Sequence, residues 1–257
     1  MKHLRIAGKE KGVIVFIHGN SSSSDVFENI LNSSLVNQTK IAVQLPGHKG
    51  NLADYHNLED FSMKAYCDEL IPMLNNLNED ILLVGNSLGG HIAIEISKKI
   101  KRLKGLVIFG SPPLKKPANF AEAFLPLPEL QTFFTKNPTD NEIEMAAKVA
   151  VYNKDYYLKI VEDFKIANPL VRAAIGNDSA ENKLANEFEI FTSLNISKFI
   201  IAGEFDPSPS LDYLQVVKNE CNCKCEVIVL NDCGHYPSLE RPNEFSKTLK
   251  EIVEQVF

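Results

Sequence analysis

The feature that most constrains the fold of this chain is an alternation of short apolar runs with longer amphipathic segments. Runs rich in β-branched residues lie at 13–17, 41–43, 81–84, 106–109, 199–202 and 227–230. Such short, continuously apolar runs are typical of strands buried on both faces, as in a parallel sheet. Helical spacing of apolar residues covers 61–74, 88–100 and 242–257. The alternation predicts an α/β fold with a doubly wound, mostly parallel sheet.

The alternation stops between about 112 and 195, where helical segments rich in Phe and Tyr follow one another. This stretch opens with prolines, which interrupt helices, at positions 112, 113, 117, 126 and 128. We therefore expect a sheet-containing core formed by 1–112 and 196–257, and an inserted helical cap formed by 113–195. In a parallel sheet, the ligand site lies at the carboxyl ends of the strands.

Charge and composition exclude several classes of function. The net charge is -6, and the chain lacks the clustered basic surface that nucleic-acid binding needs. No apolar run is long enough for a signal peptide or a membrane span, so a cytoplasmic protein without membrane contact is expected. Five cysteines, an odd number without an export signal, favour reduced thiols.

A Gly-x-Ser-x-Gly motif follows the apolar run at 81–84. Ser87 lies between Gly85 and Gly89, immediately before the predicted helix at 88–100. Between a buried strand and a helix, this motif is typical of a nucleophile elbow, in which the serine occupies a sharp, strained turn. Glycines at these positions allow the crossing backbones to approach closely. Ser87 is therefore the candidate nucleophile.

With this motif the chain resembles the α/β-hydrolase superfamily, and the resemblance extends over nearly its whole length. His18 and Gly19 resemble the His-Gly turn that follows an early strand in these enzymes, and 45–50 resembles their Pro-Gly-His-Gly loop. Similar families usually place an acidic residue where this chain has Gln44. Because the segment before the first apolar run is short, one edge strand of the family sheet is expected to be missing.

The resemblance also supplies a candidate base and acid. His235, in a Gly-His loop after the last apolar run, resembles the base of the superfamily, and Asp206, in Gly-x-x-Asp, resembles the acid that orients it. The chain order Ser, Asp, His is the order of this architecture. Glu204, two residues before Asp206, competes for the role of the acid. His18, His48 and His91 are interpreted as structural or pocket-lining residues.

The resemblance implies an oxyanion hole made by the backbone N–H groups of Asn20 and Leu88. It also implies a small-molecule acyl substrate and no metal or organic cofactor. Cys221, Cys223 and Cys225, with Cys233 nearby, lack the paired spacing of structural zinc sites. Their role stays open, and a monomer or weak homodimer is expected by default.

The sequence thus predicts a serine hydrolase that cleaves a small carboxylic ester or related acyl substrate through an acyl-enzyme. Thioester, lactone, amide and carbon–carbon cleavage stay open, because a fold and a triad do not fix the substrate. One alternative is a lyase of the menaquinone-pathway type, which would need a basic cluster for an anionic substrate, and the cap offers only Arg172 and a few lysines. A second alternative is a ligand-binding protein that has lost catalysis.

Overall fold

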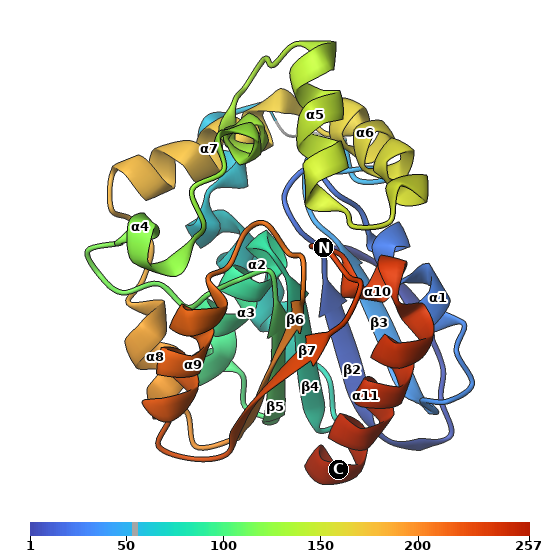
Figure 1. The fold of residues 1–257 in the computed structure, drawn as a ribbon. Coiled ribbons are helices and arrows are strands. Elements are labelled where there is room, and N and C mark those ends of the chain that lie inside the picture. Colours follow the sequence, from blue (N-terminus) through green and yellow to red (C-terminus); the bar gives the residue numbers. More distant parts are fainter. Residues whose placement is uncertain (53–55) are drawn as a thin grey trace.

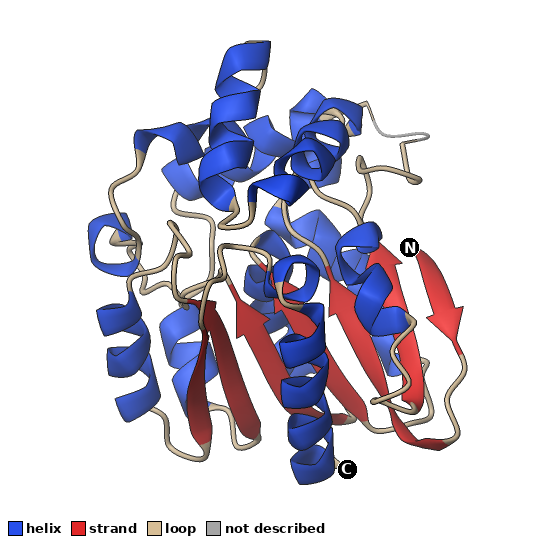
Figure 2. Ribbon diagram, turned by 45° about the vertical axis from the view of Figure 1, so that its right-hand side comes forward, coloured by secondary structure: helices blue, strands red, loops and turns tan. Residues whose placement is uncertain are grey.

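A computed structural model describes residues 1–52 and 56–257. Figures 1 and 2 show a central sheet with helices on both faces and further helices above its carboxyl ends. The seven strands lie in the order β1-β3-β2-β4-β5-β6-β7, and all neighbours are parallel except β1 and β3. The predicted doubly wound, mostly parallel sheet is therefore confirmed.

The predicted apolar runs all form strands. The strands are β1 (Lys2–Ile6), β2 (Glu10–Ile17), β3 (Gln38–Gln44), β4 (Ile81–Asn86), β5 (Leu103–Phe109), β6 (Ser197–Gly203) and β7 (Cys225–Leu230). Alternate side chains enter different cores, because successive residues of a strand point to opposite faces. Val13, Val15 and Ile17 pack in one core, whereas Ile14 and Phe16 pack in the other.

Helices cover both cores. The longer helices beside the sheet are α2 (Met63–Asn75), α3 (Leu88–Ile96), α9 (Leu211–Asn219) and α11 (Pro242–Val256), and the short ones are α1 (Glu28–Leu31) and α10 (Pro237–Glu240). Apolar residues of α2, α3 and α9 belong to one core, and those of α1 and α11 belong to the other. This two-sided burial explains why the central strands read as uninterrupted apolar runs.

Three details differ from the sequence prediction. The N-terminal segment forms an antiparallel edge strand, β1, whose Lys2 pairs with Gln44 of β3. The second is that β7 is only partly buried along most of its length, because it is the opposite edge strand. Finally, the helix predicted over 88–100 is α-helical only to Ile96 and continues as a 3-10 turn over Ser97–Lys99.

The chain between β5 and β6 is mainly helical. Its helices are α4 (Phe120–Ala123), α5 (Asp140–Ala150), α6 (Tyr157–Ile166), α7 (Pro169–Ala180) and α8 (Glu187–Ser193), with 3-10 turns at Pro128–Phe134 and Lys154–Tyr156. In Figure 1, α5, α6 and α7 lie above the carboxyl ends of the strands. Helix α8 instead packs beside α3 and α9. That 113–195 forms a cap of its own stays a prediction.

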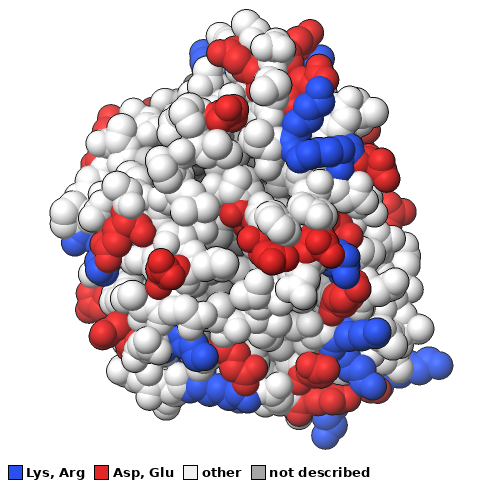
Figure 3. Space-filling view, in the orientation of Figure 1, with Lys and Arg blue, Asp and Glu red and all other residues white. Residues whose placement is uncertain are grey.

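Within residues 1–52 and 56–257, no helix is both long and apolar enough to cross a membrane. On the face shown in Figure 3, Lys and Arg are interspersed with Asp and Glu along the lower part of the molecule, and acidic side chains gather across the middle. On this face the mixed charges form no basic stripe of the kind that nucleic-acid binding needs.

Candidate active site

Ser87 occupies a strained turn between β4 and α3. Its backbone has φ 51° and ψ -122°, and its N–H donates to the Phe109 carbonyl at 2.8 Å. Two glycines make the turn possible: a Cβ on Gly85 would lie 2.4 Å from the Gly89 carbonyl oxygen, and one on Gly89 would lie 2.1 Å from the Ile17 carbonyl oxygen. The turn is therefore held by crossing backbones that admit no side chain at these positions.

The loops after β6 and β7 bring Asp206 and His235 together. The Nδ1 atom of His235 lies 2.9 Å from Oδ1 and 3.1 Å from Oδ2 of Asp206. Oδ1 also accepts a hydrogen bond from the Ser208 N–H at 2.9 Å. Both side chains are buried. This contact fixes the proton of the neutral imidazole on Nδ1 and leaves Nε2 as the acceptor.

The surroundings of His235 favour its protonated form. Burial alone would lower its pKa, but the charge of Asp206 and the hydrogen bond that His235 donates to it outweigh this effect, and the charge of Glu240 adds to them. The pKa of His235 is therefore raised above the ordinary value of 6.5. A raised pKa strengthens an imidazole as an acceptor for a serine proton.

Glu204, the competing acid, lies elsewhere. Its side chain is exposed, and its Oε2 atom accepts a hydrogen bond from the Asp232 N–H at 3.2 Å. The contact joins the loop after β6 to the loop after β7 but does not reach the imidazole. Of the two carboxylates, Asp206 is the one that contacts the candidate base.

Two contacts join the serine turn and the end of β5 to the histidine loop. The Asn86 side chain donates to the His235 carbonyl at 3.2 Å. A Cβ on Gly110 would lie 2.4 Å from Cε1 of His235, so the ring rests against that glycine. Across the described residues, Ser87 Oγ forms no hydrogen bond with His235. Such bonds are often long before substrate binds and tighten in the Michaelis complex.

The two predicted oxyanion donors flank Ser87. Leu88 begins α3, so its N–H has no partner within the helix. Asn20 directly follows Gly19, and Gly19 lies against Ser87: a Cβ added to Gly19 would be 3.0 Å from the Cβ of Ser87. In the part of the chain that the structure describes, neither amide donates a hydrogen bond to another protein group. Both N–H groups are thus free to bind a substrate oxygen.

His18 and His48 lie on the oxyanion side and are fixed by backbone groups. His18 contacts the Gly19 carbonyl through Nδ1 and the Leu45 N–H through Nε2. His48 contacts the Pro46 carbonyl through Nδ1 and accepts from the Ser21 N–H through Nε2. Burial lowers the pKa of His18 well below its ordinary value and that of His48 to about 4. Both rings are therefore neutral supports of the loop that carries Asn20.

Sequence reasoning missed Glu240, which ties the histidine loop to the segment after α5. Its two oxygens accept hydrogen bonds from four backbone N–H groups, which belong to Tyr152, Asn153, Gly234 and Tyr236. The His235 N–H also donates to the Ala150 carbonyl, at 2.8 Å. The sequence signal was an acidic residue five positions after the histidine, at the end of the short segment Pro237–Glu240.

A second pairing missed by the sequence joins His91 to Glu187. The Nδ1 atom of His91 lies 2.7 Å from Oε2 of Glu187, and the same oxygen accepts from the Leu114 N–H at 3.1 Å. Glu187 is completely buried. The sequence placed His91 near the pocket but gave no partner for it, because the two residues lie far apart in the chain.

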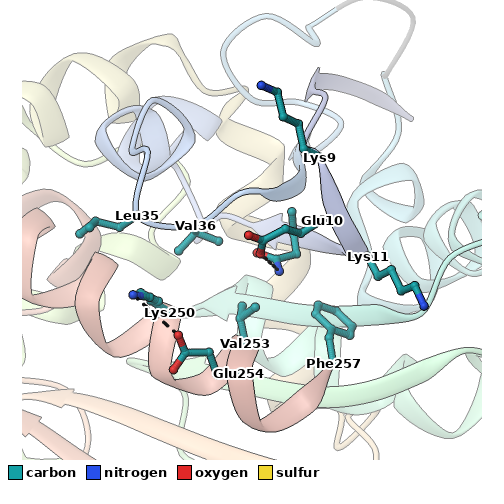
Figure 4. Close-up of a pocket in the computed structure, with 10 residues that line it drawn as sticks. Lys9, Glu10, Lys11, Leu35, Val36, Lys250, Val253, Glu254 and Phe257 are labelled. Carbon is teal, nitrogen blue, oxygen red and sulfur yellow. Dashed lines mark hydrogen bonds and ion pairs between the residues drawn. The ribbon is translucent and has the colours of Figure 1, made fainter.

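A groove with a defined lining lies far from these residues. Figure 4 shows this groove, of about 470 Å³, between the start of β2 and the end of α11, with Lys9, Val36 and Phe257 among its lining residues. It lies at the amino ends of the strands, whereas α/β sheets bind ligands at the carboxyl ends. We therefore do not assign it to the chemistry of Ser87.

Comparison with known families decides the classification. Residues 14–248 match the model of the alpha/beta hydrolase family. The chain belongs to this family. The match spans the serine turn, the loop that carries Asp206 and the loop that carries His235, so the family assignment includes every candidate site residue.

Curated relatives of this alpha/beta hydrolase are esterases by name. It is 25% identical to Methylesterase 7 of Arabidopsis thaliana, over 83% of this chain and 85% of the relative. It is 26% identical to Putative esterase/lipase 2 of Mycoplasma genitalium, over 96% of this chain and 91% of the relative.

Solved structures share the fold over almost the whole chain. A structure of the N-acyl homoserine lactonase AidH complexed with N-butanoyl homoserine superposes with a TM-score of 0.88 and 22% identity, covering 99% of this chain and 92% of that one. A thermophilic esterase from Thermogutta terrifontis gives a TM-score of 0.78 and 18% identity, covering 99% and 93%. At these identities the likeness shows the fold alone.

Proposed function

We propose that this alpha/beta hydrolase cleaves a small carboxylic ester or a related acyl substrate through an acyl-enzyme on Ser87. The observation that carries the proposal is the 2.9 Å contact between His235 Nδ1 and Asp206 Oδ1, beside a serine held at φ 51°. A strained serine next to an imidazole oriented by a buried carboxylate is the arrangement that acyl transfer requires. The esterase names of the relatives support the same reaction class.

The first half of the reaction forms the acyl-enzyme. His235 Nε2 accepts the proton of the Ser87 hydroxyl while the oxygen attacks the ester carbonyl, and the Asp206 carboxylate stabilises the imidazolium that forms. The N–H groups of Asn20 and Leu88 bind the oxyanion of the tetrahedral intermediate. The intermediate collapses when the carbon–oxygen bond to the alcohol breaks, and the alcohol leaves with the proton from His235.

The second half returns the enzyme to its starting state. Water gives a proton to His235 Nε2 and attacks the acyl carbon, and the acid product leaves when Ser87 Oγ takes that proton back. Every proton that moves is held by His235, and every developing negative charge is met by a backbone N–H group. The residues named are sufficient for this sequence of steps.

The lyase alternative is disfavoured by the surroundings of Arg172. This side chain is buried, and its N–H groups donate to the Thr135, Lys136 and Phe164 carbonyls and to Ser21 Oγ. Its guanidinium also lies 4.2 Å from the centre of the Phe164 ring. Arg172 thus uses four of its five N–H donors on protein oxygens and holds the segments above the sheet against the Asn20 loop, which disfavours a role in binding an anionic substrate.

The test is hydrolysis of 4-nitrophenyl butanoate by the wild-type protein, Ser87→Ala and the matched control Ser97→Ala. Ser97 is a buried serine beyond the far end of α3, and its hydroxyl donates to the Ile94 carbonyl. We expect Ser87→Ala to lower kcat by at least about 10⁴-fold, because a Ser-His-Asp triad without its nucleophile cannot form the acyl-enzyme. Ser97→Ala should stay close to wild type. Equal turnover by all three proteins contradicts the proposal.

A further inference from the structure

One member of the cysteine cluster meets a lysine at the amino end of the sheet. Lys198 lies at the start of β6, and Cys223 lies in the loop between α9 and β7. The Nζ atom of Lys198 is 3.2 Å from the Sγ atom of Cys223. Asp206 and His235 follow the opposite ends of the same two strands. The length of these strands therefore separates the pair from the chemistry of Ser87.

Lys198 is a buried amine without a carboxylate partner. Its side chain is completely buried, on a strand that lies between β5 and β7. The described residues supply two hydrogen-bond partners for Nζ, the Leu194 carbonyl at 2.6 Å and the sulfur of Cys223. No ion pair joins Lys198 to a carboxylate within residues 1–52 and 56–257. Burying a lysine without a counter-charge is costly, so its contact with the sulfur invites a chemical explanation.

The Leu194 carbonyl, just after α8, holds the nitrogen and the sulfur side by side. It accepts from Lys198 Nζ and, at 3.2 Å, from Cys223 Sγ. The same sulfur also donates to the Ile196 carbonyl at 3.0 Å. The backbone N–H of Lys198 donates to the Lys224 carbonyl at 3.0 Å, which ties the strand to the loop beside the contact. Two atoms held about 3–3.5 Å apart are close enough to react without a large movement.

The two reacting atoms differ in their access to solvent. Cys223 is partly exposed, whereas Lys198 is completely buried. A small oxidant such as hydrogen peroxide can therefore reach the sulfur, and the nitrogen behind it is shielded from competing groups in solution. The thiols of Cys221 and Cys225 hydrogen-bond to each other, and within the described part of the chain Cys223 contacts no other thiol. The Lys198 amine is thus better placed than a second thiol to meet an oxidised Cys223.

We propose that Cys223 is a site of reversible oxidation at which its sulfur becomes covalently bonded to the Lys198 nitrogen. Hydrogen peroxide first converts the thiol to a sulfenic acid: the peroxide O–O bond breaks, a sulfur–oxygen bond forms, and one water leaves. The amine then attacks the sulfur, and the sulfur–oxygen bond breaks with loss of a second water as the sulfur–nitrogen bond forms. An amine that starts protonated also releases one proton to solvent. Sulfur loses two electrons to peroxide, and two thiols from solution return them.

The experiment treats folded wild-type protein with equimolar hydrogen peroxide, blocks the remaining thiols with iodoacetamide and maps tryptic peptides without a reductant. Trypsin should fail to cleave after Lys198, and the peptides that carry Lys198 and Cys223 should be joined, two hydrogens lighter than their sum. Fragmentation of the joined peptides distinguishes Cys223 from Cys221, which shares its tryptic peptide. Thiol titration gives a second readout, because the bond consumes one of the five thiols and a disulfide consumes two. Dithiothreitol should reverse both changes.

Three variants provide controls. Lys198→Met and Cys223→Ser should each abolish the joined peptides, because each removes one of the two reacting atoms. Lys224→Met removes the exposed lysine next to Cys223 and should leave the joined peptides unchanged. None of these readouts depends on ester hydrolysis, so the result is independent of the proposed function.

Absence of the joined peptides from oxidised wild-type protein overturns the proposal. It is overturned whether the protein instead carries a disulfide between Cys221 and Cys225, a sulfinic acid on Cys223, or no modification. Loss of the joined peptides in Lys224→Met but not in Lys198→Met would overturn it as well, because the wrong lysine would have been assigned. The wild-type digest identifies the bonded residues by itself, so the test holds even if Lys198→Met does not fold.

Discussion

Buried histidines lie on both sides of Ser87, and their partners give them opposite properties. On the oxyanion side, His18 and His48 contact backbone groups, and burial lowers the pKa of each. On the other side, His235 contacts the carboxylate of Asp206, and its pKa is raised. A buried histidine is thus a fixed neutral support or a proton acceptor, depending on whether its partner carries a charge.

The largest loss of activity is expected when the negative charge beside His235 is removed. Asp206→Asn should lower kcat for 4-nitrophenyl butanoate by about 10⁴-fold, because an amide no longer holds the imidazole in the productive tautomer or stabilises the imidazolium. Glu204→Gln is the matched control and should cost less than about tenfold, since the exposed Glu204 side chain accepts its hydrogen bond from the Asp232 N–H and not from His235. If Glu204→Gln is instead the more damaging change, the acid has been assigned to the wrong carboxylate.

A smaller loss is expected when the support of the base is weakened. Glu240→Gln replaces one of two accepting oxygens by an NH₂ group that faces backbone N–H donors. It should lower kcat by about 10- to 100-fold and alter the pH profile, because the loop that carries His235 loses its anchor. The measurement is kcat and KM across pH 5 to 9. A fall in melting temperature with an unaltered kcat and pH profile would make Glu240 purely structural.

The pH dependence of kcat/KM compares the two sides directly. His235 must be neutral to accept the Ser87 proton, and its pKa is raised, so activity should increase with pH through a midpoint above 6.5. Below the midpoint, each pH unit should cost about tenfold in kcat/KM. His18 and His48 stay neutral over this range and should add no further step. A midpoint below 6 would mean that the carboxylate does not govern the base.

On the oxyanion side, folding lowers a histidine pKa instead of raising it, so His48 should make the protein less stable as the pH decreases. The pKa of His48 falls from 6.5 when unfolded to about 4 when folded, so the unfolded chain takes up the proton first as the pH decreases. The stabilisation from neutral His48 is complete above pH 6.5 and is lost toward pH 4, on the order of 3 kcal/mol in all. Urea unfolding at pH 7 and pH 5 should therefore show a smaller pH-dependent loss for His48→Asn than for wild type.

The sequence predicted well what depends on local patterns. Buried parallel strands require continuous apolar runs, so the positions of β2 to β6 could be predicted, and the serine turn follows from its glycines. Edge strands have weaker patterns, because one side faces solvent. For this reason β1 was missed, and the burial of β7 was overestimated.

Partners that meet only in the folded chain could not be predicted. Glu187 lies 96 positions from His91, and Glu240 accepts from Tyr152, 88 positions away. Neither pairing has a sequence spacing that identifies it, because each contact depends on how segments far apart in the chain pack together. Asp206 and His235 are just as much a tertiary pair, but the resemblance to a known family supplied their roles.

The central claim is that Ser87 is a nucleophile activated by His235, and covalent labelling tests it most directly. Folded protein is treated with a fluorophosphonate at pH 8, and the adduct is located by peptide mass spectrometry, with Asp206→Asn treated in parallel. The account predicts one adduct, on Ser87, that forms much more slowly in Asp206→Asn. An adduct on another residue, or no adduct on folded protein that cleaves esters, would contradict it.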